Sequence, residues 1–327
     1  MKNLRLRRGV VPTLLAATTL LGPAGPASAA TTTATRAGAL ASVAAHKLTS
    51  IFFANPLPSY PVWALANRCF ASATKQLGIR GTTSGPSGLN VNNQYTLDSI
   101  SQAIADNYGA IIMVPIEPPE FTSLMKQAKA KGILIATLNT GNSTTLQNVE
   151  LGTNYTDQGQ TIVANLAKRP GQQYMLALGQ NAGGPQRLFV NGLEAGIKQH
   201  PNVHLVAQIF DNADPNQTTD VVDSALTAHP KANIVVSWEG TATQGIVTAI
   251  RESHKIGKVF GVVNDLTPES IAGMKAGEIY GISKQNFCGM ATGAVKDLAA
   301  VAQGKKVPSY IDTGITFVTR HNLAKNE

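Results

Sequence analysis

Polar and aromatic side chains follow several short apolar segments of the chain, at positions where they could hold a polar ring. After the first such segment, Tyr60 and Trp63 lie in a proline-rich stretch, and an aromatic face can stack on the apolar side of a sugar. Polar side chains follow later segments in the same way, namely Asn139, Arg187, Asn264, Asp265 and Gln285. Because ligands of open α/β sheets bind at the carboxyl ends of strands, this joint pattern predicts a site for a small polar ligand.

Each of these residues also has a purely structural interpretation. Tyr60 and Trp63 could cap the hydrophobic core beneath a loop. Asn139 and Asn264 could be turn residues, since asparagine readily adopts loop conformations. Arg187 could pair with a surface acid. The functional prediction therefore depends on the whole set and not on any single member.

Sequence motifs for catalysis or for metal binding are missing. The segment Gly304–Lys306 lacks the upstream glycine and the hydroxyl residue of a phosphate-binding loop, and neither G-x-S-x-G nor H-E-x-x-H occurs. His200 and His204 have helical spacing, but Pro201 between them argues against a shared helical face. The sequence therefore predicts no enzyme, no metal site and no cofactor, although carboxylates that meet only in the folded chain would leave no motif.

The elements that would position the polar residues alternate between apolar strands and amphipathic helices. Strands are predicted at Leu48–Ala54, Ala110–Val114, Ile133–Leu138, Tyr174–Leu178, Val203–Ile209, Ile234–Ser237, Val259–Val263 and near 312–318. Helices are predicted near 62–77, 94–107, 120–131, 157–168, 186–199, 217–228, 241–255, 267–276 and 289–303. Because the strands are almost wholly apolar, they suit parallel sheets that helices cover on both faces. The predicted fold class is α/β.

The number of strands favours two sheets over one. About ten β-α repeats exceed what a single open sheet usually holds, while a closed (β/α)₈ barrel would have a similar length and alternation. The segment Asn148–Asn154 reads as a strand directly after the strand that ends at Leu138, with no helix between them. A missing helix would break a barrel, whereas a chain that crosses between two lobes would explain it.

The N-terminus has the three parts of a secretory signal peptide. A basic start is followed by an apolar run from Gly9 to Leu21 and by the small residues Ala27-Ser28-Ala29. The run is too short for a membrane anchor, and Pro12 interrupts it. We expect residues 1–29 to be removed and residues 30–46 to form a disordered lead-in. No cysteine follows the apolar run, so the sequence predicts no lipid anchor.

The charge of the exported chain does not suggest a nucleic-acid partner. The signal peptide takes four basic residues and no acidic residue, so the formal net charge falls from +8 to +4 when it is removed. No run of Lys and Arg remains that would mark a nucleic-acid-binding face. The remaining chain of about 300 residues is long enough to fold as two domains.

The order of these features resembles the type I periplasmic sugar-binding proteins, the ribose- and galactose-type receptors of ATP-driven importers. The resemblance covers residues 48–318. Pro61 and Trp63 fall where the family has its Asn-Pro-aromatic ligand loop. Arg187, within Gly183–Gly192, falls where the family has an arginine that grips the sugar.

Two positions depart from the family pattern. Asn139 and Asn264 stand where family strands end in ligand-binding acids, although Asp265 could substitute after a shift of one residue. Gln285 matches a family glutamine near the last crossover between the lobes, and Glu239 or Trp238 would complete the site. Since an amide both donates and accepts hydrogen bonds whereas a carboxylate only accepts them, the resemblance implies a weaker preference for ribose or glucose and better tolerance of an acidic sugar.

The resemblance also implies a disulfide bond between the two cysteines. Cys69 lies on the first predicted helix and Cys288 at the start of the last, and in the family both helices belong to the N-terminal lobe. An exported chain with two cysteines permits one such bond. Two separately buried thiols are the alternative.

In function, the resemblance implies a periplasmic or extracellular, monomeric protein that closes two lobes over a sugar and delivers it to the membrane permease of an ABC importer. The N-terminal lobe would comprise residues 46–153 plus 286–312, and the C-terminal lobe 154–285 plus 313–327. The same lobes would also serve a quorum-signal sensor or a chemoreceptor-linked sugar sensor. An exported enzyme is the alternative from another class. A transcription repressor of this fold is not expected, because an export signal stands where its DNA-binding helices would be.

Overall fold

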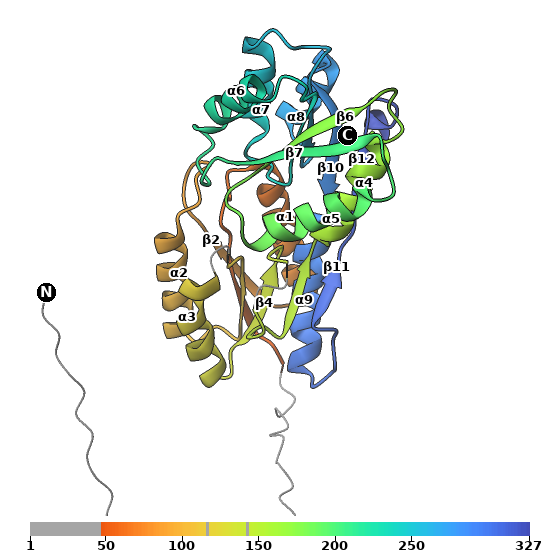
Figure 1. Ribbon diagram of the computed structural model, residues 1–327. Helices are drawn as coiled ribbons and strands as arrows, with labels where there is room; N and C mark the ends of the chain where they lie inside the picture. Colours follow the sequence, from red (N-terminus) through yellow and green to blue (C-terminus); the bar gives the residue numbers. More distant parts are fainter. Residues whose placement is uncertain (1–46, 116–117, 142–143) are drawn as a thin grey trace, which may run out of the picture. The chain divides into compact units, whose positions relative to one another are not determined.

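The structure, a computed structural model, describes residues 47–115, 118–141 and 144–327. In these residues the strands form two six-stranded sheets, and helices lie on both faces of each sheet (Figure 1). The expected signal peptide lies outside the described residues, as does all of the expected lead-in. The α/β class and the division into two sheets, both predicted from the sequence, are confirmed.

The first sheet, with its helices, forms the first lobe. Its strand order is β11-β5-β4-β3-β1-β2, and all of its strand pairings are parallel. The strands are β1 (Ser50–Ala54), β2 (Arg80–Ser84), β3 (Ala110–Met113), β4 (Leu134–Leu138), β5 (Val149–Gly152) and β11 (Tyr310–Asp312). One face carries α2 (Asn93–Ala105) and α3 (Pro118–Ala130), and the other carries α1 (Pro61–Gln76) and α9 (Phe287–Ala302).

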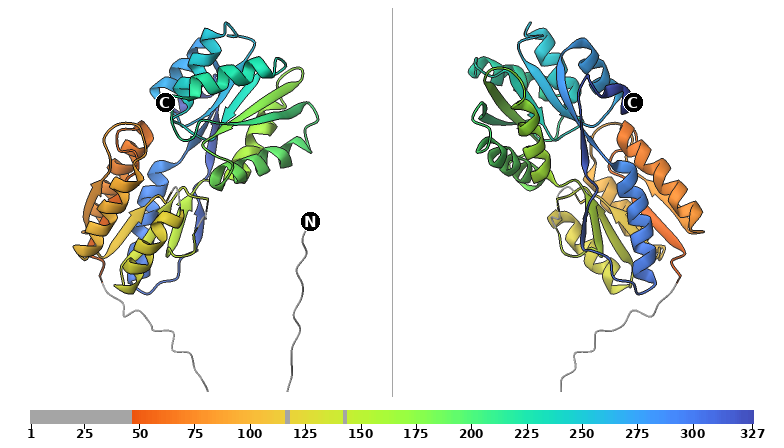
Figure 2. Two further views of the ribbon diagram at one scale, coloured as in Figure 1. Left: turned by 60° about the vertical axis from the view of Figure 1, so that its left-hand side comes forward. Right: turned by 90° about the vertical axis from the view of Figure 1, so that its right-hand side faces the viewer.

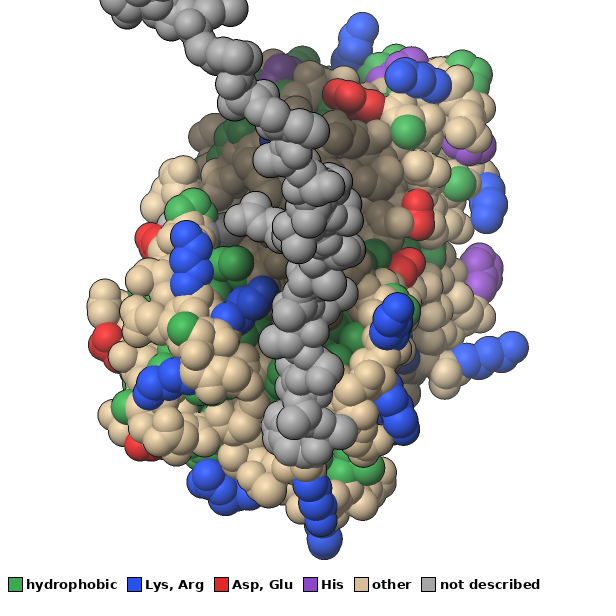
Figure 3. All heavy atoms as spheres, turned by 90° about the horizontal axis from the view of Figure 1, so that it is seen from below, with side chains coloured by type: hydrophobic (Ala, Val, Ile, Leu, Met, Phe, Trp, Pro, Cys, Tyr) green, Lys and Arg blue, Asp and Glu red, His purple; other side chains and the backbone are tan. Residues whose placement is uncertain are grey.

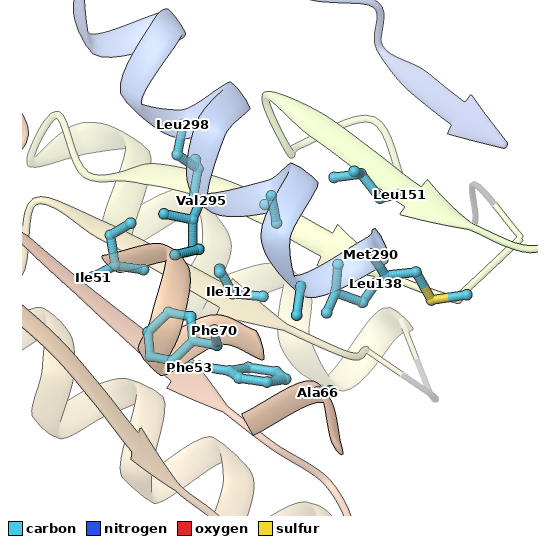
Figure 4. Close-up of a cluster of buried hydrophobic side chains, with 14 of the residues drawn as sticks. Ile51, Phe53, Ala66, Phe70, Ile112, Leu138, Leu151, Met290, Val295 and Leu298 are labelled. Atoms are coloured by element: carbon cyan, nitrogen blue, oxygen red, sulfur yellow. The ribbon is translucent and has the colours of Figure 1, made fainter. Parts of the chain in front are cut away.

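The core of the first lobe follows from the apolar character of its strands. Phe53 of β1 packs with Phe70 of α1 and Val295 of α9 on one face of the sheet (Figure 4). Its neighbour Phe52 belongs to the cluster beneath α2 and α3. Since successive strand residues point to opposite faces, a strand that is apolar at every position needs helices on both sides.

The second sheet and its helices form the second lobe. Its strand order is β12-β10-β9-β8-β6-β7, and β12 is antiparallel to β10. The strands are β6 (Gln173–Gly179), β7 (Val203–Phe210), β8 (Ile234–Ser237), β9 (Phe260–Asn264), β10 (Ile279–Gln285) and β12 (Ile315–Val318). One face carries α4 (Tyr155–Leu166) and α5 (Gly184–Ile197). The other carries α6 (Thr218–Ala228), α7 (Thr243–Glu252) and α8 (Pro268–Ala276), and a short 3₁₀ helix, Leu323–Lys325, ends the chain.

The chain passes three times from one sheet to the other (Figure 2). The passages lie at 153–154 between β5 and α4, at 286 between β10 and α9, and at 313–314 between β11 and β12. Both sheets have the same strand order. In each sheet the direction in which successive strands are added reverses once, between β1 and β3 in the first lobe and between β6 and β8 in the second. Such switch points leave a crevice at the carboxyl ends of the strands, where ligands of α/β proteins bind.

Four strands differ from the sequence prediction. β2 was not predicted because it is a largely exposed edge strand made of small polar residues. The single strand expected near 312–318 is two strands, β11 and β12, which belong to different sheets and are separated at Gly314, where φ is +73°. β10 was not predicted as a strand because Gly281 and Lys284 interrupt its apolar pattern.

A disulfide bond between Cys69 and Cys288 joins α1 to α9. The two Cα atoms are 5.3 Å apart, and both helices pack on the same face of the first sheet. The bond therefore holds one lobe together and does not bridge the two lobes.

Two features of the described residues bear on a membrane or nucleic-acid partner, namely the hydropathy of the helices and the distribution of basic side chains. In the described part of the chain, no helix combines the length and the hydropathy that crossing a bilayer would need. Lys and Arg side chains are distributed over the face seen in Figure 3 among polar and apolar residues.

Candidate functional site

A cavity of about 380 Å³ lies between the carboxyl ends of the strands of the two lobes. In the first lobe its wall includes Leu57 after β1 and Val114 after β3, which flank the switch point of that sheet. In the second lobe it includes Gln180 after β6 and Trp238 after β8, which flank the other switch point. The topology of both sheets therefore converges on this one cavity.

Aromatic side chains from both lobes line the cavity, and they are held by edge-to-face contacts. Trp63 packs against Phe287 with ring centroids 4.8 Å apart, and Tyr155 packs against Trp238 at 5.4 Å. The sequence suggested that Trp63 lies on the loop before α1. It lies instead in the first turn of α1, because Pro61 begins the helix. With only 7% of its surface exposed, Trp63 belongs to the core and to the cavity wall at once.

Three of the expected polar residues meet in one hydrogen-bonded amide network. Gln285, the last residue of β10, exchanges hydrogen bonds with the Asn139 amide at 3.2 and 3.4 Å. Its carbonyl oxygen also accepts a hydrogen bond from Asn264 at 2.9 Å, and its amide nitrogen donates to the Thr153 hydroxyl. Gln158 of α4 extends the network by donating to the Asn264 side chain at 2.8 Å.

The network ties the carboxyl ends of strands in both sheets to the passage at 153. Asn139 follows β4 in the first lobe with a left-handed φ of +56°, a conformation that asparagine tolerates. Asn264 ends β9 in the second lobe. Because the amide of Gln285 has used both of its hydrogen atoms and accepts two bonds, it has little capacity left for a ligand. Among the described residues, the Asn139 and Asn264 amides each donate one hydrogen bond, which leaves each of them one amide hydrogen for a ligand.

Two carboxyl groups of the second lobe line the cavity and are almost fully buried. Glu239 is 4% exposed and Asp265 is 3% exposed, and each has one oxygen without a hydrogen-bond partner. Burial, followed by the nearby charge of Asp211, raises the pKa of Glu239 to about 8, against a hydrogen bond from Gln180. Burial also raises the pKa of Asp265 to about 8, and the neighbouring Tyr60 hydroxyl opposes this shift. These groups therefore change charge in the physiological pH range.

The two lobes approach each other closely at Gly240. A Cβ atom at this position would collide with the Tyr60 hydroxyl of the first lobe and with the Asp265 carboxylate of the second. Burial and then the charge of Asp265 raise the pKa of Tyr60 well above its ordinary value, so this hydroxyl keeps its proton. A hydroxyl that stays protonated can donate a hydrogen bond across the cleft.

Arg187 does not line the cavity, and its assignment as a ligand-binding residue is not supported by this structure. Its side chain is exposed on the first turn of α5. The preceding residue, Gln186, is 1% exposed and points inward, and neither of its amide atoms has a partner. One residue turns a helix by about 100°, so a shift of one position in the alignment exchanges the buried residue for the exposed one.

The sequence analysis missed the aromatic residues that come directly after the lobe passages. Tyr155 begins α4 and Phe287 begins α9, so each follows a passage by one or two residues. A signal was available, since an aromatic residue at the start of a helix beside a lobe passage must lie near the cleft. Trp238 and Glu239, the alternatives that the sequence offered after β8, both line the cavity.

The described residues contain no group of three or more His, Cys, Asp and Glu side chains that could hold a metal ion. The arrangement suits noncovalent capture instead. Aromatic faces can cover the apolar side of a ring, while amide and carboxyl groups can meet its polar edge.

Comparisons with known proteins agree with this geometry. A family model described as a periplasmic binding protein domain matches residues 51–306. The D-allose-binding periplasmic protein of Escherichia coli is 24% identical over 269 residues, which make up 76% of this chain and 84% of that protein.

Solved structures share the fold over most of their length. A glucose-galactose binding protein from Geobacillus stearothermophilus has a TM-score of 0.78 and 21% identity, over 85% of this chain and 99% of that one. An ABC transporter solute-binding protein from Burkholderia graminis, in complex with D-arabinose, has a TM-score of 0.76 and 24% identity, over 85% and 97%. A periplasmic solute-binding protein from Actinobacillus succinogenes, with bound D-allose, has a TM-score of 0.75 and 19% identity, over 86% and 100%.

Proposed function

The chain belongs to the periplasmic binding protein family, and from this we propose that it captures a small sugar or sugar derivative in the cavity between its lobes. The observation that carries the proposal is the cavity itself, which lies at the switch points of both sheets and has aromatic and amide walls. At about 380 Å³ it falls within the range of small-molecule sites, toward the lower end.

The relatives support a monosaccharide as the class of ligand. The names of similar proteins specify D-allose, D-arabinose, and glucose with galactose. In the present cavity, Trp63 and Tyr155 would cover the apolar faces of a ring, since aromatic faces suit its C–H groups. Asn139 and Asn264 would donate their remaining amide hydrogens to ring hydroxyls.

Capture would require the lobes to close, and release would require them to open. The passages at 153–154, 286 and 313–314 are the places where the backbone can hinge, because all other connections stay within one lobe. The closed form would present the surface that a membrane permease of an ABC importer recognises. Export through the predicted signal peptide and a monomeric state belong to the same proposal.

Isothermal titration calorimetry on the exported chain tests the proposal, after a thermal-shift screen with monosaccharides, polyols, sugar acids and amino sugars. We expect one or more monosaccharides to bind with one site per chain and to be recovered chemically unchanged. A screen in which no carbohydrate raises the melting temperature would contradict the proposal. Turnover of a bound sugar would indicate the enzyme alternative instead.

A further inference from the structure

The cavity wall carries acidic groups without any basic counterpart. Among the described residues that line the cavity there is no Lys, Arg or His, while Glu239 and Asp265 are both present. A third acid, Asp211, lies close enough to raise the pKa of Glu239. No basic group lowers the pKa of Glu239 or of Asp265. If both cavity carboxyls ionise, their charge has no compensation from the lining residues.

Each of these two carboxyl groups also has one oxygen without a hydrogen-bond donor among the described residues. Both side chains are more than nine-tenths buried. Their oxygens Glu239 Oε2 and Asp265 Oδ1 have no hydrogen-bond partner among the described residues. An unpaired buried carboxylate is unfavourable, because it has lost its hydrogen bonds to water and no protein donor or positive charge replaces them. A ligand that brings both a positive charge and N–H donors would remove both penalties.

We propose that the ligand of this cavity is a sugar that carries a protonated primary amine, and that Glu239 and Asp265 hold its ammonium group. The inference rests on the proposed function and narrows the class of its ligand. The aromatic side chains of the wall would cover the sugar ring, and their negative faces are compatible with a nearby cation.

The same geometry disfavours the other ligand classes. A quaternary ammonium ligand has no N–H group to offer to Glu239 Oε2 and Asp265 Oδ1, so it would leave both oxygens unpaired. An acidic sugar would place a negative charge beside two carboxyl groups that have no basic neighbour on the wall, and the exposed Arg187 of α5 does not line it. The tolerance for acidic sugars expected from the sequence is therefore reversed. A neutral sugar would satisfy the hydrogen bonds but would leave the charge uncompensated.

Matched sugars test the inference by calorimetry on the exported chain at neutral pH. The ligands are D-glucosamine, D-galactosamine and D-allosamine, each compared with its parent hexose and with its N-acetyl derivative, which has the same ring but no positive charge. We expect one amine or more to bind at least tenfold more tightly than both of its matched partners.

Two isosteric variants locate the ammonium group. Glu239→Gln and Asp265→Asn should each weaken binding of the preferred amine at least tenfold more than they weaken binding of the parent hexose. Glu252→Gln, which removes an exposed acid at the end of α7, is the matched control and should leave both affinities unchanged.

The outcomes separate this inference from the proposed function. If a parent hexose binds as tightly as its amine, or if no amine binds while a neutral sugar does, the inference is wrong and sugar capture stands. If an amine binds but both isosteric variants bind it as tightly as the original protein, the carboxyl groups do not hold it and the inference is again wrong. If neither amines nor any other carbohydrate binds, the inference and the proposed function both fail.

Discussion

Trp63 shows how one side chain in this protein belongs to the core and to the cavity wall together. It lies in the first turn of α1, packs against Phe287, and is 7% exposed. We expect Trp63→Ala to lower ligand affinity by about 30- to 150-fold, which corresponds to the roughly 2–3 kcal/mol of apolar burial that the ring provides. Calorimetry with the sugar identified in the screen measures the loss.

Arg187→Ala is the control for this prediction, since the exposed side chain does not line the cavity. The Arg187→Ala protein should bind the sugar with an affinity within twofold of that of the original protein. Circular dichroism must show that the Trp63→Ala protein remains folded, because the ring also supports the first lobe. If both variants bind as tightly as the original protein, the ligand does not contact this wall.

The two buried carboxyls make the stability of the ligand-free protein depend on pH. The pKa values of Glu239 and Asp265 are about 8 in the folded protein and ordinary in the unfolded chain. Between these values the folded protein holds protons that the unfolded chain has released, so its free energy of unfolding decreases as pH rises. We expect a decrease of about 1.4 kcal/mol per pH unit for each group, and therefore of about 3 kcal/mol per pH unit for the two together, between about pH 5 and pH 8.

Urea denaturation at a series of pH values measures this slope. Other groups titrate in the same range, so the comparison with Glu239→Gln is decisive. The variant cannot ionise at this position, and we expect it to be more stable than the original protein at pH 8 and to show a shallower slope. An identical slope in the two proteins would mean that Glu239 is already ionised when folded.

At the scale of single residues, the sequence predicted which strand ends line the cavity. It did not predict which of their side chains have hydrogen-bonding groups left for a ligand. Glu239, Asn264 and Asp265 all line the cavity, as the positions after strands predicted. The amide network could not be predicted, because it depends on Gln158 and Thr153, which come from a helix and a lobe passage. The error at Arg187 has the same origin, since its exposure depends on the rotation of α5 about its axis.

Among the elements, α1 and α9 lie far apart along the chain and are joined by a covalent bond. The disulfide between Cys69 and Cys288 spans a sequence separation of 219 residues. A loop of this length restricts the unfolded chain strongly, and the chain-entropy model gives about 5 kcal/mol as an upper value. We expect the Cys69→Ala, Cys288→Ala double variant to lose about 2–5 kcal/mol in free energy of unfolding.

Guanidinium denaturation with and without a reducing agent measures this loss. The reducing agent should destabilise the original protein and leave the double variant unchanged. Ligand affinity should be the same in both proteins below the transition, because the bond lies within one lobe and neither cysteine lines the cavity. Equal stability of the two proteins would contradict a disulfide that constrains the unfolded chain.

The elements themselves were largely predictable, for a definite physical reason. β1, β3 and β4 are buried at every position and almost wholly apolar because helices cover both faces, and the helices show the pattern of one buried side. β2 escaped prediction because an exposed edge strand needs no apolar residues. β11 and β12 were merged because the change of sheet at Gly314 is a tertiary event that leaves only a glycine in the sequence. The family resemblance was the most reliable inference, and the match over residues 51–306 confirms it.

In the whole molecule, the amide network joins the two sheets through side chains. Gln285 stands one residue before the passage at 286, and it joins Asn139 of the first lobe to Asn264 of the second. Thr153 adds the passage at 153 to the same network. A movement of one lobe relative to the other must therefore stretch or break these hydrogen bonds, so the network sets how freely the lobes can open and close.

Gln285→Met tests this coupling, because methionine has a similar length but forms none of the four side-chain hydrogen bonds of Gln285. Asn139, Asn264 and Thr153 would each lose a partner, and we expect a loss of about 2–4 kcal/mol in free energy of unfolding. The distances between spin labels on α2 and α6, measured by double electron–electron resonance, should broaden in the ligand-free variant, and ligand affinity should fall at least tenfold because closure must order a looser hinge. Gln173→Met is the matched control, since Gln173 is equally buried but donates only to Pro170 and Gly171 within the second lobe. It should lower stability without changing the label distances. If the two variants give the same distance distribution as the original protein, the hydrogen bonds of Gln285 do not restrain the lobes, and the hinge must be controlled by the backbone of the three passages alone.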